Sequence, residues 1–476
     1  MMGMTTTRRR AIAGLGALSA VSTASFGATA RKSRRPNIVF ILADDMGYAD
    51  VGCYGRPDVR TPAIDSLAKR GVRQLQAYAN SAVCSATRTA LITGRYQYRL
   101  RVGLEEPIAG DSAGIGMPPE HPTLPSMLKA SGYRTALMGK WHLGSLPDFG
   151  PLKSGYEEFF GFRGGALDYF SHKGSRDNDD LWRNDEPVKI PGYLTNQLGE
   201  HAADFIERSA ALDKPFFLSV HFNAPHWPWE GPGDQAESER IGGTGLRDLD
   251  GGSNATYAKM IEAMDAEVGR ILSALDAHKL REDTIVVFTS DNGGERFADT
   301  WPFSGQKTEL LEGGLRVPSI ISWPNGLPQG TTNNQVSITM DWVATLLSAA
   351  GVRPDEKYPL DGMDLLPSLR GGTDVKRTLY WRYKANHQRA VRDGDLKFLK
   401  IADNTYLFDV VNDPLERANL KQRRPEDFAR LAGMWQDWNK TMLPELDSTF
   451  TEGVQAKDQA DHIGAGPAIK TADPGN

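Results

Sequence analysis

Continuous apolar runs alternate along most of the chain with longer stretches that have a helical periodicity. The runs occupy four segments, residues 36–43, 133–138, 215–222 and 284–289. Short runs of this kind are typical of parallel strands that are buried on both faces. Residues 194–206 and 257–275 place apolar side chains three and four positions apart, which predicts amphipathic helices. This alternation predicts an α/β domain over residues 36–370, with a large, mostly parallel or mixed sheet flanked by helices.

The pattern changes toward the C-terminal end of the chain. Between residues 379 and 408 the runs are short and alternating, and turn residues such as Asp393-Gly394 separate them, which predicts antiparallel hairpins. We expect a helix over residues 425–442 to pack on these strands. The sequence therefore predicts a smaller α+β domain over residues 375–450, made of an antiparallel sheet and a helix. Residues 451–476 contain few large apolar side chains, and we expect a disordered tail.

The first thirty residues have the composition of an export signal. Arg8, Arg9 and Arg10 precede a weakly apolar stretch that ends in Ala28-Thr29-Ala30. A basic start, an apolar middle and small residues at a cleavage site are typical of such signals, and the arginine pair is typical of the twin-arginine type. A disordered basic tail would not explain the Ala-Thr-Ala ending. We therefore expect residues 1–30 to direct export to the periplasm or the outside of a bacterial cell.

The composition excludes several classes of protein. Lys and Arg number 55 against 60 Asp and Glu, and the formal net charge of −5 does not favour nucleic-acid binding. Hydrophobic residues at 40% and charged residues at 24% exclude a collagen or a wholly disordered chain. Two cysteines, Cys53 and Cys84, are too few for a disulfide-stapled scaffold. No uncharged apolar run reaches about 18 residues, so we expect no membrane-spanning helix.

Two predicted strands end in pairs of oxygen-donor side chains. Asp44-Asp45 follows the run at 36–43, and Asp291-Asn292 follows the run at 284–289. Ligands of open parallel sheets bind beyond the carboxyl ends of the strands, so the two pairs can meet around one ion. Three carboxylates and an amide oxygen suit Ca²⁺, or alternatively Mg²⁺, better than zinc. Either pair alone would be explained by a turn or a helix cap, but together they predict a metal site.

Cys84 precedes a stretch that is predicted to be helical. A helix N-terminus favours anions through its free N–H groups and its dipole. Arg88 lies four residues further on, about one turn, and therefore on the same side of the helix. A lone cysteine is more often a small buried hydrophobe, so a catalytic interpretation depends on the surrounding sequence.

That surrounding sequence resembles the signature of the formylglycine-dependent (type I) sulfatases of the alkaline phosphatase superfamily, C-x-P-S-R-x-x-x-L-x-G-R. The matching residues are Cys84, Arg88, Leu91, Gly94 and Arg95. Ala86 and Thr87 stand where proline and serine are commonest, and alanine occurs in a tolerated variant of the motif. The resemblance implies that a formylglycine-generating enzyme oxidises Cys84 to Cα-formylglycine.

Further motifs of the family, including its arylsulfatases and N-acetylgalactosamine-6-sulfatases, follow in the expected order between residues 36 and 420. They are the opening strand at 37–45, G-K-W-H-L-G at 139–144, A-P-H-W-P at 224–228, G-Q-K-T-E at 305–309, and the C-terminal segments 406–409 and 413–416. Lys140 and His142 are two positions apart, so in an extended backbone they project to the same side.

The resemblance implies a role for each matching residue. One Ca²⁺ or Mg²⁺ per chain would be bound by Asp44, Asp45, the modified Cys84, Asp291 and Asn292. The hydrated aldehyde at position 84 would attack sulfur, with Arg88, Lys140 and Lys307 offsetting the negative charge. His142 would be the base that lets sulfate leave, while His226 and Lys307 would protonate the leaving oxygen. His172 is a candidate substrate contact or an ordinary loop histidine, and His221, within a strand, is more simply a core histidine.

The implied activity is hydrolysis of a sulfate ester with release of inorganic sulfate. We expect the substrate to be a small-molecule or oligosaccharide sulfate ester, with a sulfated carbohydrate preferred because exported bacterial sulfatases often act on polysaccharide fragments. Two alternatives stay open. One is a phosphodiester or phosphonate monoester hydrolase of the same superfamily, and the other is a non-catalytic binder of sulfated glycans in which Cys84 is not converted. The presence of both a proton donor and a proton acceptor argues against the binder.

Overall fold

The computed structural model describes residues 35–109, 114–174, 176–242 and 251–453. The export signal predicted for residues 1–30 and all but the first three residues of the predicted tail lie outside these ranges. Within the described ranges, no helix combines the length and the apolar character that a membrane span requires.

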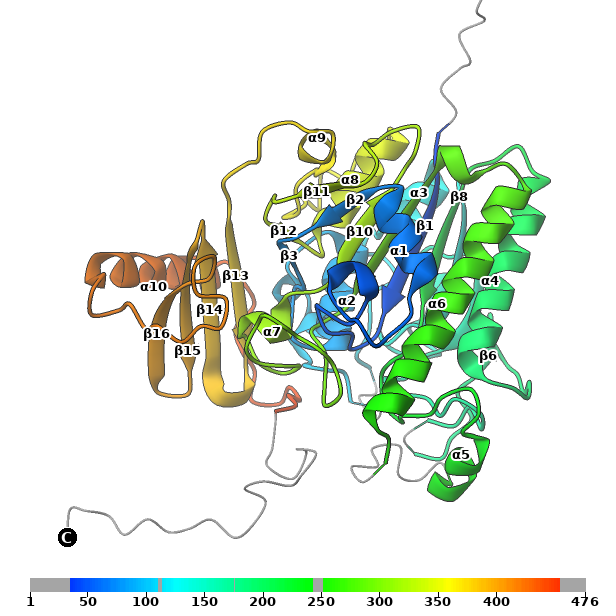
Figure 1. The fold of residues 1–476 in the computed structure, drawn as a ribbon, viewed down its shortest axis with the longest axis horizontal. Coiled ribbons are helices and arrows are strands. Elements are labelled where there is room, and N and C mark those ends of the chain that lie inside the picture. Colours follow the sequence, from blue (N-terminus) through cyan, green and yellow to red (C-terminus); the bar gives the residue numbers. More distant parts are fainter. Residues whose placement is uncertain (1–34, 110–113, 175, 243–250, 454–476) are drawn as a thin grey trace, which may run out of the picture. The chain divides into compact units, whose positions relative to one another are not determined.

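A ten-stranded mixed sheet organises the larger part of the chain (Figure 1). Its strand order is β11-β2-β10-β9-β1-β8-β4-β5-β6-β7. The central parallel strands are β9 (Thr284–Ser290), β1 (Asn37–Ala43), β8 (Phe216–His221), β4 (Arg134–Lys140) and β5 (Glu158–Phe162). Four of these strands coincide with the continuous apolar runs of the sequence.

Short strands complete the two edges of the sheet. They are β2 (Val72–Gln74), β10 (Ser319–Ser322) and β11 (Thr331–Asn333) on one side, and β6 (Trp182–Arg183) and β7 (Glu186–Pro187) on the other. The pairs β9–β10, β10–β2, β5–β6 and β6–β7 are antiparallel, which makes the sheet mixed, as the sequence allowed. A separate two-stranded sheet joins β3 (Ala77–Tyr78) to β12 (Ser337–Ile338).

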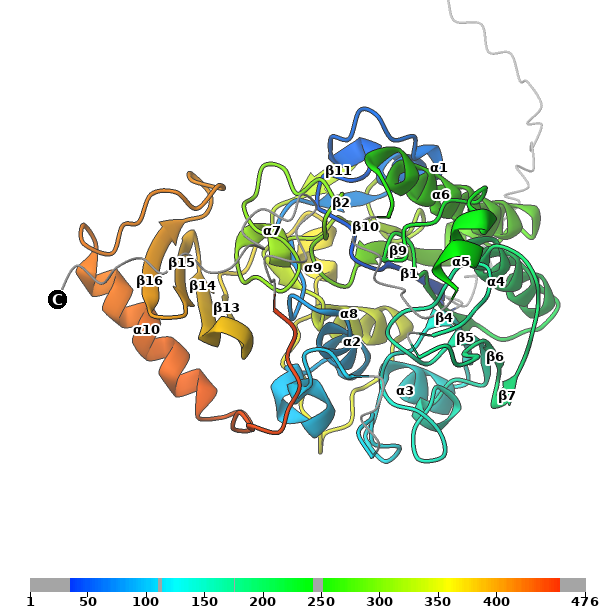
Figure 2. The same ribbon diagram turned by 90° about the horizontal axis from the view of Figure 1, so that it is seen from below.

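Helices cover both faces of the central sheet (Figures 1 and 2). One face packs against α1 (Pro62–Lys69), α4 (Leu194–Ala210) and α6 (Asn254–Ala277), and the other against α2 (Cys84–Thr93), α3 (Leu124–Ala130), α8 (Asp341–Ala350) and α9 (Leu366–Leu369). Short helices α5 (Gln235–Ile241) and α7 (Glu312–Leu315) lie in connections. Single 3₁₀ turns occur at Gly52–Tyr54, Gln97–Arg99, Arg101–Leu104, Leu152–Ser154, Arg281–Asp283 and Ala385–His387.

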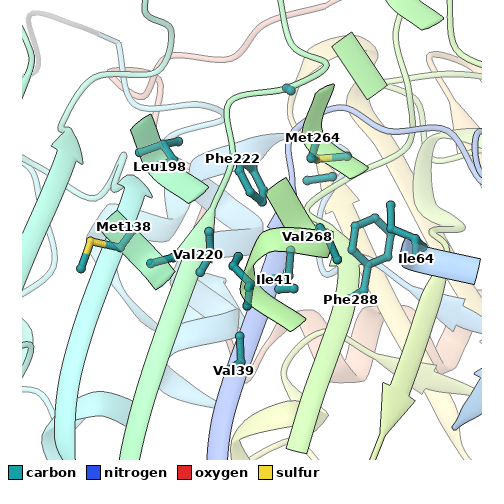
Figure 3. Close-up of a cluster of buried hydrophobic side chains, with 14 of the residues drawn as sticks. Val39, Ile41, Ile64, Met138, Leu198, Val220, Phe222, Met264, Val268 and Phe288 are labelled. Atoms are coloured by element: carbon teal, nitrogen blue, oxygen red, sulfur yellow. The ribbon is translucent and has the colours of Figure 1, made fainter. Parts of the chain in front are cut away.

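Each face of β1 contributes to a different hydrophobic core. Val39 and Ile41 point toward α4 and α6, where Figure 3 shows them beside side chains of both helices. Ile38, Phe40 and Leu42 point the other way, toward α3 and α8. Because successive side chains of a strand alternate between faces, a strand covered on both sides needs apolar residues at every position. This explains the unbroken apolar run from Ile38 to Ala43.

A four-stranded antiparallel sheet follows the central sheet in the chain. It consists of β13 (Thr378–Tyr383), β14 (Gln388–Asp393), β15 (Leu396–Ile401) and β16 (Asn404–Asp409), with α10 (Pro425–Asn439) packed on β14 and β15. The predicted hairpins and helix are therefore present, although the helix ends at Asn439. Lys397 of β15 joins the sheet to α7 through a fully buried ion pair with Glu312, 2.9 Å long.

Candidate active site

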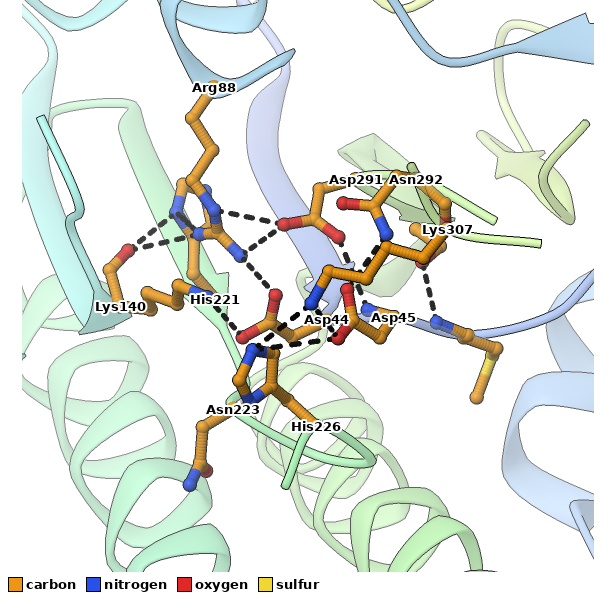
Figure 4. Close-up of polar contacts among 12 residues, drawn as sticks. Asp44, Asp45, Arg88, Lys140, His221, Asn223, His226, Asp291, Asn292 and Lys307 are labelled. Carbon is orange, nitrogen blue, oxygen red and sulfur yellow. Dashed lines mark hydrogen bonds and ion pairs between the residues drawn. The ribbon is translucent and has the colours of Figure 1, made fainter. Parts of the chain in front are cut away.

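The oxygen-donor pairs that follow β1 and β9 lie side by side at the carboxyl edge of the central sheet (Figure 4). Ala43 is in register with Ser290, so Asp44 and Asp291 leave the sheet as neighbours. The Asp45 amide donates a hydrogen bond to Asp291 Oδ1 over 3.2 Å, and Asn292 Nδ2 donates one to Asp45 Oδ1 over 2.7 Å. All four side chains are buried. The structure thus brings together the two pairs that the sequence proposed.

Cys84 is the first residue of α2 and faces this acidic group. Its sulfur and one side-chain ligand atom each of Asp44, Asp45 and His226 all lie within 4.8 Å of one another. Arg88, one turn along the helix, is buried and donates from Nη2 to Asp291 Oδ2 over 2.8 Å. The helix therefore places both the Cys84 side chain and the Arg88 guanidinium beside the acidic group.

Two buried lysines pair with the two aspartates that follow β1. Lys140, the last residue of β4, donates from Nζ to Asp44 Oδ2 over 2.6 Å. Lys307 donates from Nζ to Asp45 Oδ2, also over 2.6 Å, and its Nζ lies 3.4 Å from His226 Nε2. A hydrogen bond of 2.6 Å to the Trp227 carbonyl places a proton on His226 Nδ1, so Nε2 faces Lys307 as an acceptor.

His142 reaches the site in a way that the sequence did not predict. The expectation that Lys140 and His142 project to one side of an extended backbone is wrong, because β4 ends at Lys140 and His142 has a left-handed φ of 53°. The ring of His142 instead donates from Nε2 to the Ile108 carbonyl over 3.0 Å. A Cβ at Gly165 would lie 2.7 Å from His142 Cε1, so only glycine leaves room for the ring. Nδ1 has no hydrogen-bond partner among the residues described.

Burial and neighbouring charges set the protonation states of these groups. Burial lowers the pKa of both His142 and His226 well below that of a free imidazole, so both rings are neutral at pH 7. Burial opposes the charge on Lys307, but Asp45 and Glu295 outweigh it and raise the pKa of Lys307 well above its ordinary value. The site therefore holds proton acceptors and a protonated amine together.

The three carboxylates of the acidic group, Asp44, Asp45 and Asp291, are buried close together. Burial, together with the charges of Asp291 and Asp45, raises the pKa of Asp44 to about 8 even though Lys140 and Arg88 oppose the shift. In the described part of the chain, the buried Oδ1 of Asn292 has no hydrogen-bond partner. Clustered carboxylate oxygens and an unpaired amide oxygen fit a hard divalent cation. These residues therefore form a candidate metal site.

A cavity of about 550 Å³ opens onto these residues. Cys84, His142, His226 and Lys307 line it, together with loop residues that include Arg163, Trp227, Phe450 and Glu452. Cavities of this size hold ligands as large as one or two sugar rings, since ligand pockets measure roughly 300–1,000 Å³.

The other histidines of the sequence analysis lie away from the cavity wall. His221 is buried next to the Lys140 carbonyl, 3.2 Å from its Nδ1, which agrees with a histidine of the core. His172 is buried in the loop after β5 and is not a cavity-lining residue, and its role as a substrate contact stays a prediction.

Sequence reasoning missed several residues of this site. The carbonyl of Ile108, the backbone of Gly165 and the carboxylate of Glu295, 3.5 Å from Lys307, carry no motif. Arg163 had a usable signal, because it directly follows β5 at the carboxyl edge of the sheet.

One cavity at the edge of an α/β sheet gathers buried carboxylates, cationic side chains and a helix N-terminus. This combination is typical of hydrolases of anionic esters, because it stabilises the negative charge that develops during the reaction. The chain belongs to the sulfatase family, since the sequence model of that family, described as Sulfatase, matches residues 36–352. A second model, described as N-sulphoglucosamine sulphohydrolase, C-terminal, matches residues 305–435.

Individual relatives agree with this assignment. The N-acetylgalactosamine-6-sulfatase of Canis lupus familiaris is 33% identical over 403 residues, which cover 80% of this chain and 74% of the dog protein. Arylsulfatase A of Homo sapiens is 31% identical over 382 residues, covering 73% and 71%. The crystal structure of Ps i-CgsB in complex with k-i-k-neocarrahexaose is 29% identical, with a TM-score of 0.79 and coverage of 90% and 98%. The protein is therefore an enzyme that hydrolyses sulfate esters. This excludes the alternative of a non-catalytic binder of sulfated glycans.

Proposed function

We propose that this sulfatase releases inorganic sulfate from a sulfated carbohydrate, using a formylglycine made from Cys84 and one divalent cation, Ca²⁺ or Mg²⁺. The observation that carries the proposal is the convergence of Cys84, Arg88, two lysines and two histidines on the candidate metal site at the wall of one cavity. The relatives named for N-acetylgalactosamine-6-sulfate, and the solved complex with a neocarrahexaose, support a carbohydrate substrate.

The residues fit both a divalent cation and a formylglycine. Asp44, Asp45, Asp291, Asn292 and the modified side chain at position 84 would hold the cation, which supplies Lewis-acid stabilisation of negative charge on sulfate oxygens. Burial raises the pKa of the Cys84 thiol, so an unmodified cysteine would be a neutral and weak nucleophile. A formylglycine at position 84 supplies a hydroxyl nucleophile when its aldehyde is hydrated.

The chain's own side chains provide charge compensation and proton transfer. Arg88, Lys140 and Lys307 place fixed positive charge around the position where sulfate oxygens accumulate negative charge. His142 accepts a proton at Nδ1, because its Nε2 proton is held by the Ile108 carbonyl. Lys307, hydrogen-bonded to His226, carries the proton that the leaving alcohol oxygen needs.

Measured release of inorganic sulfate from a panel of sulfated sugars, an aryl sulfate and an aryl phosphodiester tests this proposal. We expect release from at least one sugar sulfate, with the sulfate esters hydrolysed faster than the phosphodiester. A faster phosphodiester would instead favour the phosphodiester or phosphonate hydrolase reading. Mass spectrometry of the Cys84 peptide, from protein made with a formylglycine-generating enzyme, should show the aldehyde, and Cys84→Ala should abolish turnover.

We also propose that residues 1–30 are a twin-arginine export signal and that the mature enzyme works in the periplasm or outside the cell. A fusion of these residues to a reporter that is active only after export tests this. The reporter should be exported by the wild-type leader and retained when Arg9 and Arg10 are both changed to lysine.

A further inference from the structure

Arg163 lines the active-site cavity with hydrogen-bonding capacity that the protein does not use. It directly follows β5, and its side chain is 2% exposed. Neither Nε nor Nη1 has a hydrogen-bond partner within the described ranges. A buried guanidinium with unpaired donors is uncommon, because such groups are costly to desolvate without partners.

The remaining part of the guanidinium is held firmly. Nη2 donates to the Asn184 carbonyl over 3.0 Å and to Asp185 Oδ1 over 2.8 Å, and the guanidinium carbon lies 4.1 Å from the ring centre of Trp182. An arginine has five N–H donors, so two are used on Nη2 and three remain on Nε and Nη1. Arg163 is thus positioned in advance for a ligand rather than free to turn away.

The loop that begins at Arg163 also contacts the proposed base. Gly164, Gly165 and Ala166 line the same cavity, and Gly165 packs against the ring of His142. Two residues of chain span at most about 7 Å, so the backbone of Arg163 lies close to the reaction centre.

We propose that Arg163 binds a second anionic group of the substrate, a sulfate or a carboxylate located beside the sulfate that is hydrolysed. This inference rests on the proposed function and adds a preference for saccharides with more than one negative charge. Planar guanidinium donors match the oxygens of either group. Asp185, whose side chain is 46% exposed, and the buried Asp180 supply opposite charge near Arg163, but neither is hydrogen-bonded to Nε or Nη1 among the residues described.

Matched substrates test the proposal on the wild-type enzyme. They are a hexose monosulfate, the same hexose with two sulfates, and a disaccharide that joins the monosulfated hexose to a uronic acid. We expect kcat/KM to be at least tenfold higher for one of the two doubly charged substrates than for the monosulfate, mainly through a lower KM. Preference for the disulfate identifies a second sulfate, and preference for the uronide identifies a carboxylate.

The variant Arg163→Gln should reduce that preference at least tenfold. Arg134→Gln is the control, because Arg134 also lies over an aromatic ring, Phe205, but is only partly buried and stands at the amino end of β4. The control removes the same charge from the molecule and should leave the preference within twofold of wild type.

Two results would overturn the role of Arg163. One is a wild-type enzyme without preference for either doubly charged substrate, a result that needs no variant to fold. The other is an equal loss of kcat/KM on all substrates in Arg163→Gln, which would identify a purely structural residue.

If no ester releases sulfate, the proposed function fails instead. Calorimetric binding of the disulfated hexose to wild type and Arg163→Gln would then still decide whether Arg163 recognises the second group.

Discussion

At the scale of single residues, hydrogen bonds fix one side chain of the site as a proton acceptor and another as a proton donor. His142 is fixed as an acceptor by the Ile108 carbonyl, while Lys307 stays protonated beside Asp45. The two groups belong to different loops, after β4 and between β9 and α7. A substitution can therefore remove one group without the other, and its effect can be measured on the reaction step proposed for that group.

Lys307→Ala and His226→Ala should slow hydrolysis of sulfates with poor leaving groups more than of activated aryl sulfates. A sugar alcohol needs a proton as it leaves, whereas a nitrophenolate does not, and one proton-transfer group contributes roughly 10²–10⁴ in rate. Measured kcat values for a sugar sulfate and 4-nitrophenyl sulfate give the comparison. His278→Gln, at the exposed end of α6, is the control. Equal losses on both substrates would remove the donor role.

Glu230 offers a second test at this scale, through pH-dependent stability. Burial and the charge of Asp168 raise its pKa to about 9, against 4.5 for an ordinary glutamate. Between these values the folded protein keeps a proton that the unfolded chain loses, so stability falls as pH rises across this range. Glu230→Gln removes this penalty and keeps an acceptor for the Tyr169 amide.

We expect Glu230→Gln to raise Tm by roughly 1–3 °C at pH 8, with a smaller gain at pH 6. Thermal unfolding at the two pH values is the measurement, and Glu239→Gln on the exposed side of α5 is the control. A Tm gain that is larger at pH 6 than at pH 8 would contradict a proton held by Glu230.

At the scale of elements, the four-stranded sheet helps to position the loop that carries Lys307. Gln388, the first residue of β14, accepts a hydrogen bond from the Leu310 amide over 2.8 Å and donates one to the Thr308 carbonyl over 2.9 Å. Thr308 has a left-handed φ of 70°, so the loop has a turn that depends on such support. The smaller sheet therefore contributes to the geometry of the active site without lining the sulfate position.

Gln388→Ala should therefore displace Lys307 without removing it. We expect kcat on a sugar sulfate to fall about tenfold, with a smaller fall on 4-nitrophenyl sulfate, because the displaced group is the proton donor. Gln388→Glu restores only the acceptor and should recover part of the loss. Steady-state kinetics on both substrates, with the exposed Gln422→Ala as control, would reject this role if kcat were unchanged.

The elements differ in how well the sequence predicts them. Strands with unbroken apolar runs, such as Ile38–Ala43, are visible because both of their faces are buried. The short strands β6, β7 and β12 contain two residues each, which is too short for any periodicity. The metal-site residues are visible because they directly follow long strands. Gln388 is not, because its partners lie about 80 residues away and its type has no motif.

At the scale of the whole molecule, the candidate metal site joins segments that are far apart in the sequence. Asp45 and Asp291 are separated by 246 residues, and their connection depends on the pairing of β1 with β9. A cation bound between them would stabilise the folded state by mass action as well as serve the chemistry.

Removal of divalent cations should therefore lower both activity and stability. We expect dialysis against a chelator to reduce sulfate release at least 100-fold and to lower Tm, because three buried carboxylates lose their shared counter-charge. Adding back Ca²⁺ or Mg²⁺ separately, with activity and Tm measured in parallel, shows which ion restores both. Unchanged activity after complete removal, verified by elemental analysis, would exclude a cation at this site.

The last described residues of the chain complete the wall of the cavity. Phe450 and Glu452 line it, the Phe450 amide donates to Glu105, and the Tyr383 hydroxyl donates to the Glu452 carbonyl. The ribosome synthesises this segment after the strands of both sheets, the last of which ends at Asp409. Completion of the cavity wall therefore follows the synthesis of every strand that positions the site.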